Sequence, residues 1–164
     1  MLNSLRSPVA WLGLLTCCLQ VQAADVVSVS FVKPETFSDA RDAYGRAEVN
    51  LLVLAQHLQA LGQQRLPSGQ TLHIEILDVD LAGQIRPWRQ GVQDVRVLNG
   101  RADWPSVQLR YTLKQGDQVL KSGDERISDL SYFTRIHRNR DGDTLRHEKR
   151  MLQAWFDERL LPAH

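Results

Sequence analysis

Apolar and polar residues alternate along four segments of this chain, and this period-two pattern restricts its fold more than any other feature. The alternation predicts strands near residues 27–31, 72–81, 107–113 and 119–127, with a short strand near 95–97. Helical spacing appears twice, in a leucine stripe over residues 51–61 and again over residues 145–156. Strands clustered between two helices indicate an α+β fold: a mainly antiparallel sheet of about four to five strands, with two amphipathic helices packed on one face. A fully buried α/β sheet is less favoured because strands and helices do not alternate.

Local signals set the expected ends of these elements. Ser38 or Asp39 is a candidate N-cap for the first helix, and Gly62 is a candidate end. A loop is expected from residue 83 to about residue 93. Gly116 lies in the predicted turn of a hairpin between the last two strands.

The strand over residues 72–81 changes phase in its middle. Leu72, Ile74 and Ile76 alternate in one register, whereas Leu77, Val79 and Leu81 follow the other. A β-bulge near Ile76 would keep all six apolar side chains on the core side and place His73, Glu75, Asp78 and Asp80 on the opposite face. Burial of Leu77 on two sides is the alternative.

The N-terminal 23 residues have the pattern of a secretory signal. Arg6 precedes an uncharged apolar run over residues 9–21, and Val21 and Ala23 occupy the positions that a signal peptidase reads. The run of about thirteen residues is shorter than the roughly twenty that span a bilayer. We therefore predict a cleaved signal peptide over residues 1–23, a single domain over residues 24–164, and a periplasmic location; a lipoprotein fits less well because the residues before Cys17 and Cys18 match poorly.

The predicted mature domain contains no cysteine, because Cys17 and Cys18 are the two in the chain. This excludes a disulfide framework, a thiolate metal site and a cysteine nucleophile. Loss of Arg6 takes the formal net charge from +1 to zero. A neutral domain is not typical of proteins that bind nucleic acids or anionic membranes through an excess of Lys and Arg.

Several short phrases, in this order, resemble a domain-of-unknown-function family of small exported proteobacterial proteins. The phrases are Phe31 to Pro34, Phe37 to Asp39, the run DVDLAG over residues 78–83, Arg96 with Val97, Leu109 to Tyr111, Asp129 with Tyr132, Glu148 to Leu152, and Trp155 with Phe156. The resemblance covers essentially all of the predicted mature chain. It implies export and a single domain, and it implies no activity and no catalytic residues.

Three acidic residues are weak candidates for a metal site. Asp78 and Asp80 share the polar strand face with His73 and Glu75, and carboxylates with an imidazole can hold a divalent cation. Side chains on one strand face point in parallel, however, so a solvated face or partners for nearby arginines are favoured. Glu148 lies near the apolar stripe of the last helix and needs a partner there, for which Arg96 and Arg135 are candidates.

Residues 137–148 match the spacing of an EF-hand calcium loop in part. His137, Asn139, Asp141, Gly142 and Glu148 stand at positions one, three, five, six and twelve. His137 replaces the usual Asp, and Arg138 and Arg140 add positive charge. A polar turn with Asp143 or Thr144 as N-cap of the last helix is the favoured interpretation.

Aromatic and arginine side chains gather in two predicted loops. Arg86 and Trp88 belong to the first, Trp104 to a second, and Arg135 and Arg138 follow the hairpin. Trp and Arg are enriched at binding sites, so we predict these five residues as a partner-binding surface, with solvated loops as the alternative.

No nucleophile elbow, phosphate loop or dinucleotide fingerprint is present in the sequence. The sequence therefore favours a non-enzymatic binding or accessory domain, without a cofactor, for an envelope protein or a cell-wall glycan. The alternative is a small metal-dependent periplasmic hydrolase that uses Asp78, Asp80 and Glu148.

Cleavage of the predicted signal gives the first test. We expect intact-mass analysis of the protein purified from its own periplasm to give a chain that begins at Ala24 or Asp25. A chain that retains Arg6 would contradict the prediction, and a mass increment of a lipid on a cysteine would support the lipoprotein alternative.

Overall fold

The computed structural model describes residues 26–87, 94–134, 143 and 145–161. Its helices and strands follow the predicted order, with one further strand and one short 3₁₀ helix. They are β1 (Val27–Phe31), η1 (Pro34–Thr36), α1 (Glu48–Arg65), β2 (Gln70–Asp80), β3 (Gln84–Arg86), β4 (Val95–Val97), β5 (Ser106–Gln115), β6 (Gln118–Ser128) and α2 (Arg146–Arg159).

Four strands form the main sheet in the order β1-β2-β5-β6. β1 pairs with β2 in parallel, and the two remaining pairings are antiparallel. The turn at Gly116 joins β5 to β6 as predicted, with a left-handed φ of 57° that favours glycine. The mainly antiparallel α+β fold is therefore confirmed.

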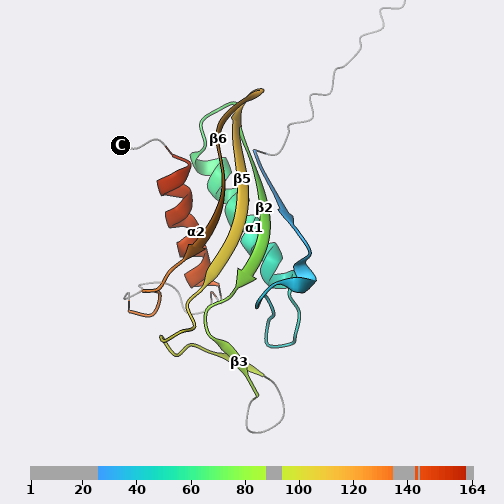
Figure 1. The fold of residues 1–164 in the computed structure, drawn as a ribbon, viewed down its shortest axis with the longest axis vertical. Coiled ribbons are helices and arrows are strands. Elements are labelled where there is room, and N and C mark those ends of the chain that lie inside the picture. The colour runs from blue at the N-terminus through green and yellow to red at the C-terminus, as the bar shows by residue number, and fades with distance from the viewer. Residues whose placement is uncertain (1–25, 88–93, 135–142, 144, 162–164) are drawn as a thin grey trace, which may run out of the picture.

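β3 was not predicted, because its three residues lie in a segment whose Gly and Pro content indicated a loop. It pairs with β4, with Ile85 opposite Arg96, and the two form a separate two-stranded sheet. A three-residue strand carries too little alternation to be recognised without its partner. Figure 1 shows β3 at the lower end of the molecule, at the opposite end of the main sheet from the β5–β6 hairpin.

The core lies between the sheet and the two helices. Leu58 of α1, Leu109 of β5 and Phe156 of α2 are completely buried and belong to one apolar cluster. α1 lies behind the sheet with α2 beside it (Figure 1), and the two helices contact each other. Both amphipathic helices therefore cover one face, as their stripes predicted. Over the described residues, neither helix combines the length and apolar character needed to cross a bilayer.

The predicted β-bulge is present in β2. The register against β5 shifts between Ile76 and Asp78, and Val79 and Leu81 are buried after the shift. Leu77 is only half-buried, so five of the six apolar side chains reach the core rather than all six. The bulged position itself is the exception, because it is the extra residue that has no opposite partner.

The predicted start of the first helix is wrong. α1 begins at Glu48, and Asp39 instead forms a parallel bridge with Asp80. The Asp39 amide donates to the Val79 carbonyl, and the Leu81 amide donates to the Asp39 carbonyl, each at 2.9 Å. Tertiary pairing with the end of β2 overrides the local capping preference at this position.

Gly62 also differs from its predicted role as the end of α1, because the helix continues to Arg65. Gly62 is buried, and a Cβ built on it would collide with Cγ2 of Val27 on β1. The missing side chain therefore allows α1 and β1 to approach each other closely.

We expect Gly62→Ala to destabilise the protein by about 1–3 kcal/mol, because the added methyl group overpacks this contact. Chemical denaturation of the single variants and of Gly62→Ala combined with Val27→Ala measures the coupling between the two positions. The double variant should lose less stability than the sum of the single variants. Additive losses of stability would show that the close contact with Val27 does not limit the size of the side chain at position 62.

Candidate functional site

The open face of the main sheet is polar and internally paired. Ser28 Oγ and His73 Nδ1 share a hydrogen bond of 2.8 Å between β1 and β2. Arg110 of β5 donates to Glu75 at 3.3 Å and to Asp124 of β6 at 3.1 Å. His73 and Glu75 thus have partners on neighbouring strands. This agrees with the interpretation that the polar face is solvated or pairs with nearby arginines.

Asp78 is held by a neighbouring loop. It accepts hydrogen bonds from the Ser38 amide at 2.7 Å and from Ser38 Oγ at 2.8 Å, so both of its oxygens are used. Asp80 lies near Asp39 and Asp78, and its pKa is raised, first by burial and then by these two neighbouring charges. Among the described residues, no three His, Cys, Asp or Glu side chains gather in a way that could hold a metal ion.

Glu148 is buried at the start of α2, with 2% of its surface exposed. Its Oε1 accepts a hydrogen bond from the Ala82 amide at 2.7 Å, whereas Oε2 has no partner in the described part of the chain. Burial raises the pKa of this carboxyl, and the Ala82 hydrogen bond and the nearby Arg96 charge oppose the rise. The suggested ion pair with Arg96 does not form; Arg135, the other suggested partner, lies outside the described residues.

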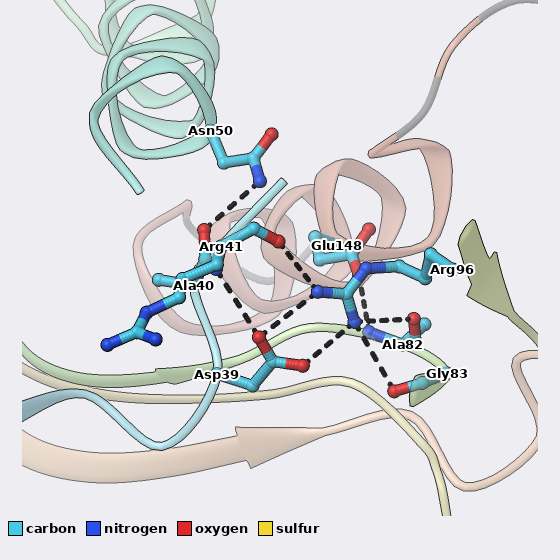
Figure 2. Close-up of polar contacts among 8 residues, drawn as sticks. All are labelled: Asp39, Ala40, Arg41, Asn50, Ala82, Gly83, Arg96 and Glu148. Atoms are coloured by element: carbon cyan, nitrogen blue, oxygen red, sulfur yellow. Dashed lines mark hydrogen bonds and ion pairs between the residues drawn. The ribbon is translucent and has the colours of Figure 1, made fainter. Parts of the chain in front are cut away.

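Arg96 instead binds the segment that precedes α1 (Figure 2). Its two terminal nitrogens donate to the two oxygens of Asp39 at 3.0 and 3.1 Å. The same guanidinium donates to the carbonyls of Ala82, Gly83 and Arg41 at 3.3, 3.3 and 2.8 Å. Such a planar fork suits a carboxylate bound through two parallel bonds. We call this set of bonds the Arg96 clamp.

The Arg96 clamp joins the two walls of a cleft of about 960 Å³. One wall is the segment from η1 to the start of α1, and the other comes from β3 and from Asp94, just before β4. Asn50 fixes the first wall to α1, because its Nδ2 donates to the Ala40 carbonyl at 3.0 Å inside the core. The lining residues are Pro34, Glu35, Phe37, Ser38, Asp39, Ala40, Arg41, Asp42, Gly45, Ala47, Glu48, Leu51, Gln84, Ile85 and Asp94.

The cleft carries an excess of negative charge. Of its five carboxylates, Asp39 is paired with Arg96 and Asp42 with Arg46. Within the described residues, no ion pair involves the three others, Glu35, Glu48 and Asp94. Arg41 is the single cationic residue among the lining residues. The cleft therefore offers carboxylates to a cationic ligand.

The predicted aromatic and arginine surface is described only in part. Arg86 is exposed at the end of β3, and Trp104 is 38% exposed in the loop before β5. Neither residue lines the cleft. Trp88, Arg135 and Arg138 lie outside the described residues, as do His137, Asn139, Asp141 and Gly142 of the loop with calcium-like spacing.

A buried tyrosine holds the loop that carries Trp104. The Tyr132 hydroxyl donates to Asp103 at 2.8 Å and accepts a hydrogen bond from the Gly100 amide at 3.2 Å. Burial and the Asp103 carboxylate raise the pKa of Tyr132 to about 12, so the hydroxyl remains a donor at neutral pH. Trp104 therefore projects from a loop with a defined conformation.

The cleft was not predicted from the sequence. Its walls come from residues 34–51 and from Gln84, Ile85 and Asp94, in segments that have neither strand nor helix periodicity over most of their length. A usable signal was the unusually long connection between β1 and α1, because long connections in compact domains are often functional. Glu35, Asp39 and Asp42 fall within it, and Glu48 is the first residue of α1.

The raised pKa of Glu148 predicts a dependence of stability on pH. Unfolded Glu148 loses its proton near its ordinary pKa of 4.5, whereas the folded protein retains the proton to higher pH. Between the pKa of the unfolded state and that of the folded state, the folded protein binds more protons than the unfolded protein. The stability of the protein therefore falls as the pH rises through this range. Each pH unit between the two pKa values lowers the free energy of unfolding by about 1.4 kcal/mol.

Denaturation at several pH values above 4.5 compares the wild type with Glu148→Gln, a neutral side chain of the same shape. We expect the variant to gain stability relative to the wild type as the pH rises, while the exposed Glu158→Gln on the same helix does not. A relative gain by the wild type would show instead that Arg96 stabilises the ionised carboxylate.

Searches of curated proteins and of solved structures return no match. One family matches, with the description "Protein of unknown function (DUF3016)", over residues 25–158. The match includes β1 through most of α2 and therefore every residue of the Arg96 clamp and of the cleft. The chain belongs to the DUF3016 family.

Proposed function

We propose that this chain is a periplasmic, non-enzymatic binding domain that holds a positively charged, partly apolar segment of an envelope protein in its acidic cleft. The observation that carries the proposal is the combination of unpaired carboxylates and apolar side chains around one cleft. Glu35 and Glu48 supply negative charge, and Phe37, Leu51 and Ile85 supply apolar surface. The predicted signal peptide supports the location.

The size and chemistry of the cleft suit an extended peptide segment. Its volume of about 960 Å³ is at the upper end of the roughly 300–1,000 Å³ of ligand pockets. Carboxylates that face a basic side chain attract it over several ångströms and set the orientation of the segment, while apolar contacts supply affinity. Because the Arg96 clamp holds both walls, the site does not have to form when the segment binds.

The other functions suggested by the sequence have less support. A metal-dependent hydrolase would need Asp78, Asp80 and Glu148 to act together, yet Ser38 occupies both oxygens of Asp78 and Glu148 is buried. A neutral cell-wall glycan would not use the excess of negative charge. Trp104 remains available to a larger partner, because it is exposed on a loop that Tyr132 holds through Asp103.

Fluorescence anisotropy with labelled decapeptides tests the proposal. We expect a peptide of alternating Lys and Leu to bind, and a peptide of alternating Glu and Leu not to bind. Glu35→Gln with Glu48→Gln should weaken binding by about tenfold, which corresponds to ~1.4 kcal/mol. Binding should also weaken when the salt is raised from about 50 to about 300 mM, because salt screens exposed charges.

A matched control removes the same charge elsewhere. Asp117→Asn with Glu158→Gln changes two exposed carboxylates that do not line the cleft. Equal weakening by this pair would show that net charge alone attracts the peptide and would contradict a site in the cleft. Cosedimentation with purified cell-wall sacculi, unaffected by the Glu35 and Glu48 changes, would favour the glycan instead.

A further inference from the structure

β6 is a long strand at the edge of the main sheet. Its 11 residues pair with β5 on one side, and within the described residues no strand pairs with its other side. An open edge presents unpaired backbone donors and acceptors, which favours the addition of another strand. The opposite edge strand, β1, has 5 residues.

We propose that β6 pairs antiparallel with β6 of a second copy of this chain, so that the two four-stranded sheets form one continuous eight-stranded sheet. A two-fold axis perpendicular to the sheet passes through Gly123 in this arrangement. Such an interface is isologous, because each residue of one copy meets its counterpart in the other.

The charges along β6 select this register. With Gly123 opposite Gly123, Lys121 of each copy lies opposite Glu125 of the other, and Ser122 lies opposite Asp124. Lys121 and Glu125 both point to the helix side of the sheet, because their partners in β5 are the core residues Leu113 and Leu109. Opposite charges directly across two strands stabilise the pair, whereas like charges destabilise it.

Neighbouring registers lose this complementarity. A shift of the axis to residue 121 places Lys121 opposite Lys121, and a shift to residue 125 places Glu125 opposite Glu125. A shift to residue 124 places Asp124 opposite itself, and a shift to residue 122 pairs Lys121 with Gly123. Only the axis through Gly123 pairs both acidic positions with a basic or hydroxyl side chain.

The two charged residues can take part without losing their present contacts. The Lys121 ammonium donates once, to the Arg159 carbonyl at 2.7 Å, and has further protons to donate. Glu125 accepts hydrogen bonds from Tyr111 at 3.3 Å and Trp155 at 3.2 Å and forms an ion pair with Arg159 at 3.4 Å, and these contacts hold its carboxylate in place at the edge. These contacts on the helix side of the sheet therefore hold Lys121 and Glu125 in place before a second copy binds.

The register shift between Leu113 and Lys114 sets one end of the proposed interface. Leu120 falls in the irregularity, so regular pairing covers residues 121–125 of each copy, and the end set by the irregularity lies at Lys121. Val119 and Leu120, which are 52% and 41% exposed, lie just beyond this end. The second copy would cover part of this apolar surface.

Sedimentation equilibrium over about 10–500 µM protein tests the proposal, because a dimer depends on concentration. We expect the wild type to reach the mass of a dimer. Lys121→Glu should raise the dissociation constant by at least about tenfold, whereas Lys114→Glu, an equal change on exposed β5 surface, should not. Amides of β6 should also exchange more slowly with deuterium as the concentration rises.

A mixing experiment tests the register itself. Lys121→Glu alone and Glu125→Lys alone should both be monomeric, because each brings like charges together across the axis. An equimolar mixture should form a heterodimer, because every pair at these positions is then oppositely charged. Thermal unfolding checks that Glu125→Lys is folded; if it is not, the Lys121→Glu result and the exchange data decide.

Three outcomes would overturn the proposal. The wild type could be monomeric over the whole concentration range, which would leave the β6 edge free for a strand of another protein. It could form a dimer that Lys121→Glu does not weaken, which would place the interface elsewhere. It could also form a dimer in which the β6 amides are not protected.

Discussion

The Arg96 clamp is the interaction on which the end of the molecule that carries the cleft depends. One guanidinium binds the Asp39 carboxylate and three backbone carbonyls, and so joins the pre-helical segment, the end of β2 and the β3–β4 sheet. None of these segments is long enough to be stable by itself, since short strands need other elements to pack against. Arg96 therefore does more than neutralise Asp39: it determines the relative position of the two walls of the cleft.

The geometry of this end comes from the turn that follows β2. Ala82 donates its amide to Glu148 of α2 and offers its carbonyl to Arg96, so one residue connects the second helix to the clamp. Gly83 has a left-handed φ of 81°, and a Cβ there would lie 2.5 Å from the Val97 carbonyl oxygen. Glycine is needed at this position for both its dihedral angle and its lack of a side chain.

The fold could be predicted in large part because each strand and helix buries one face. Apolar residues therefore recur along the sequence with the period of that element. The alternation around Leu109 and the phase change near Ile76 predicted two neighbouring strands and the bulge in one of them, and both predictions are confirmed. The helix start near Asp39 and the helix end at Gly62 were wrong for the same reason. Each residue has a local preference that a contact with a distant segment overrides.

The class of fold, the buried face of each helix and strand, and the absence of cysteine from residues 24–164 could all be predicted from the sequence, because they follow from residue type and periodicity. Which carboxylates are paired, which are buried and which line a cleft became apparent in the folded protein alone. Asp39, Glu148 and Glu48 are equally acidic in the sequence, yet one is clamped by Arg96, one is enclosed in the core and one faces the cleft. The physical reason is that the state of a carboxylate depends on distance to other charges and on burial, and both arise from residues far apart in the chain.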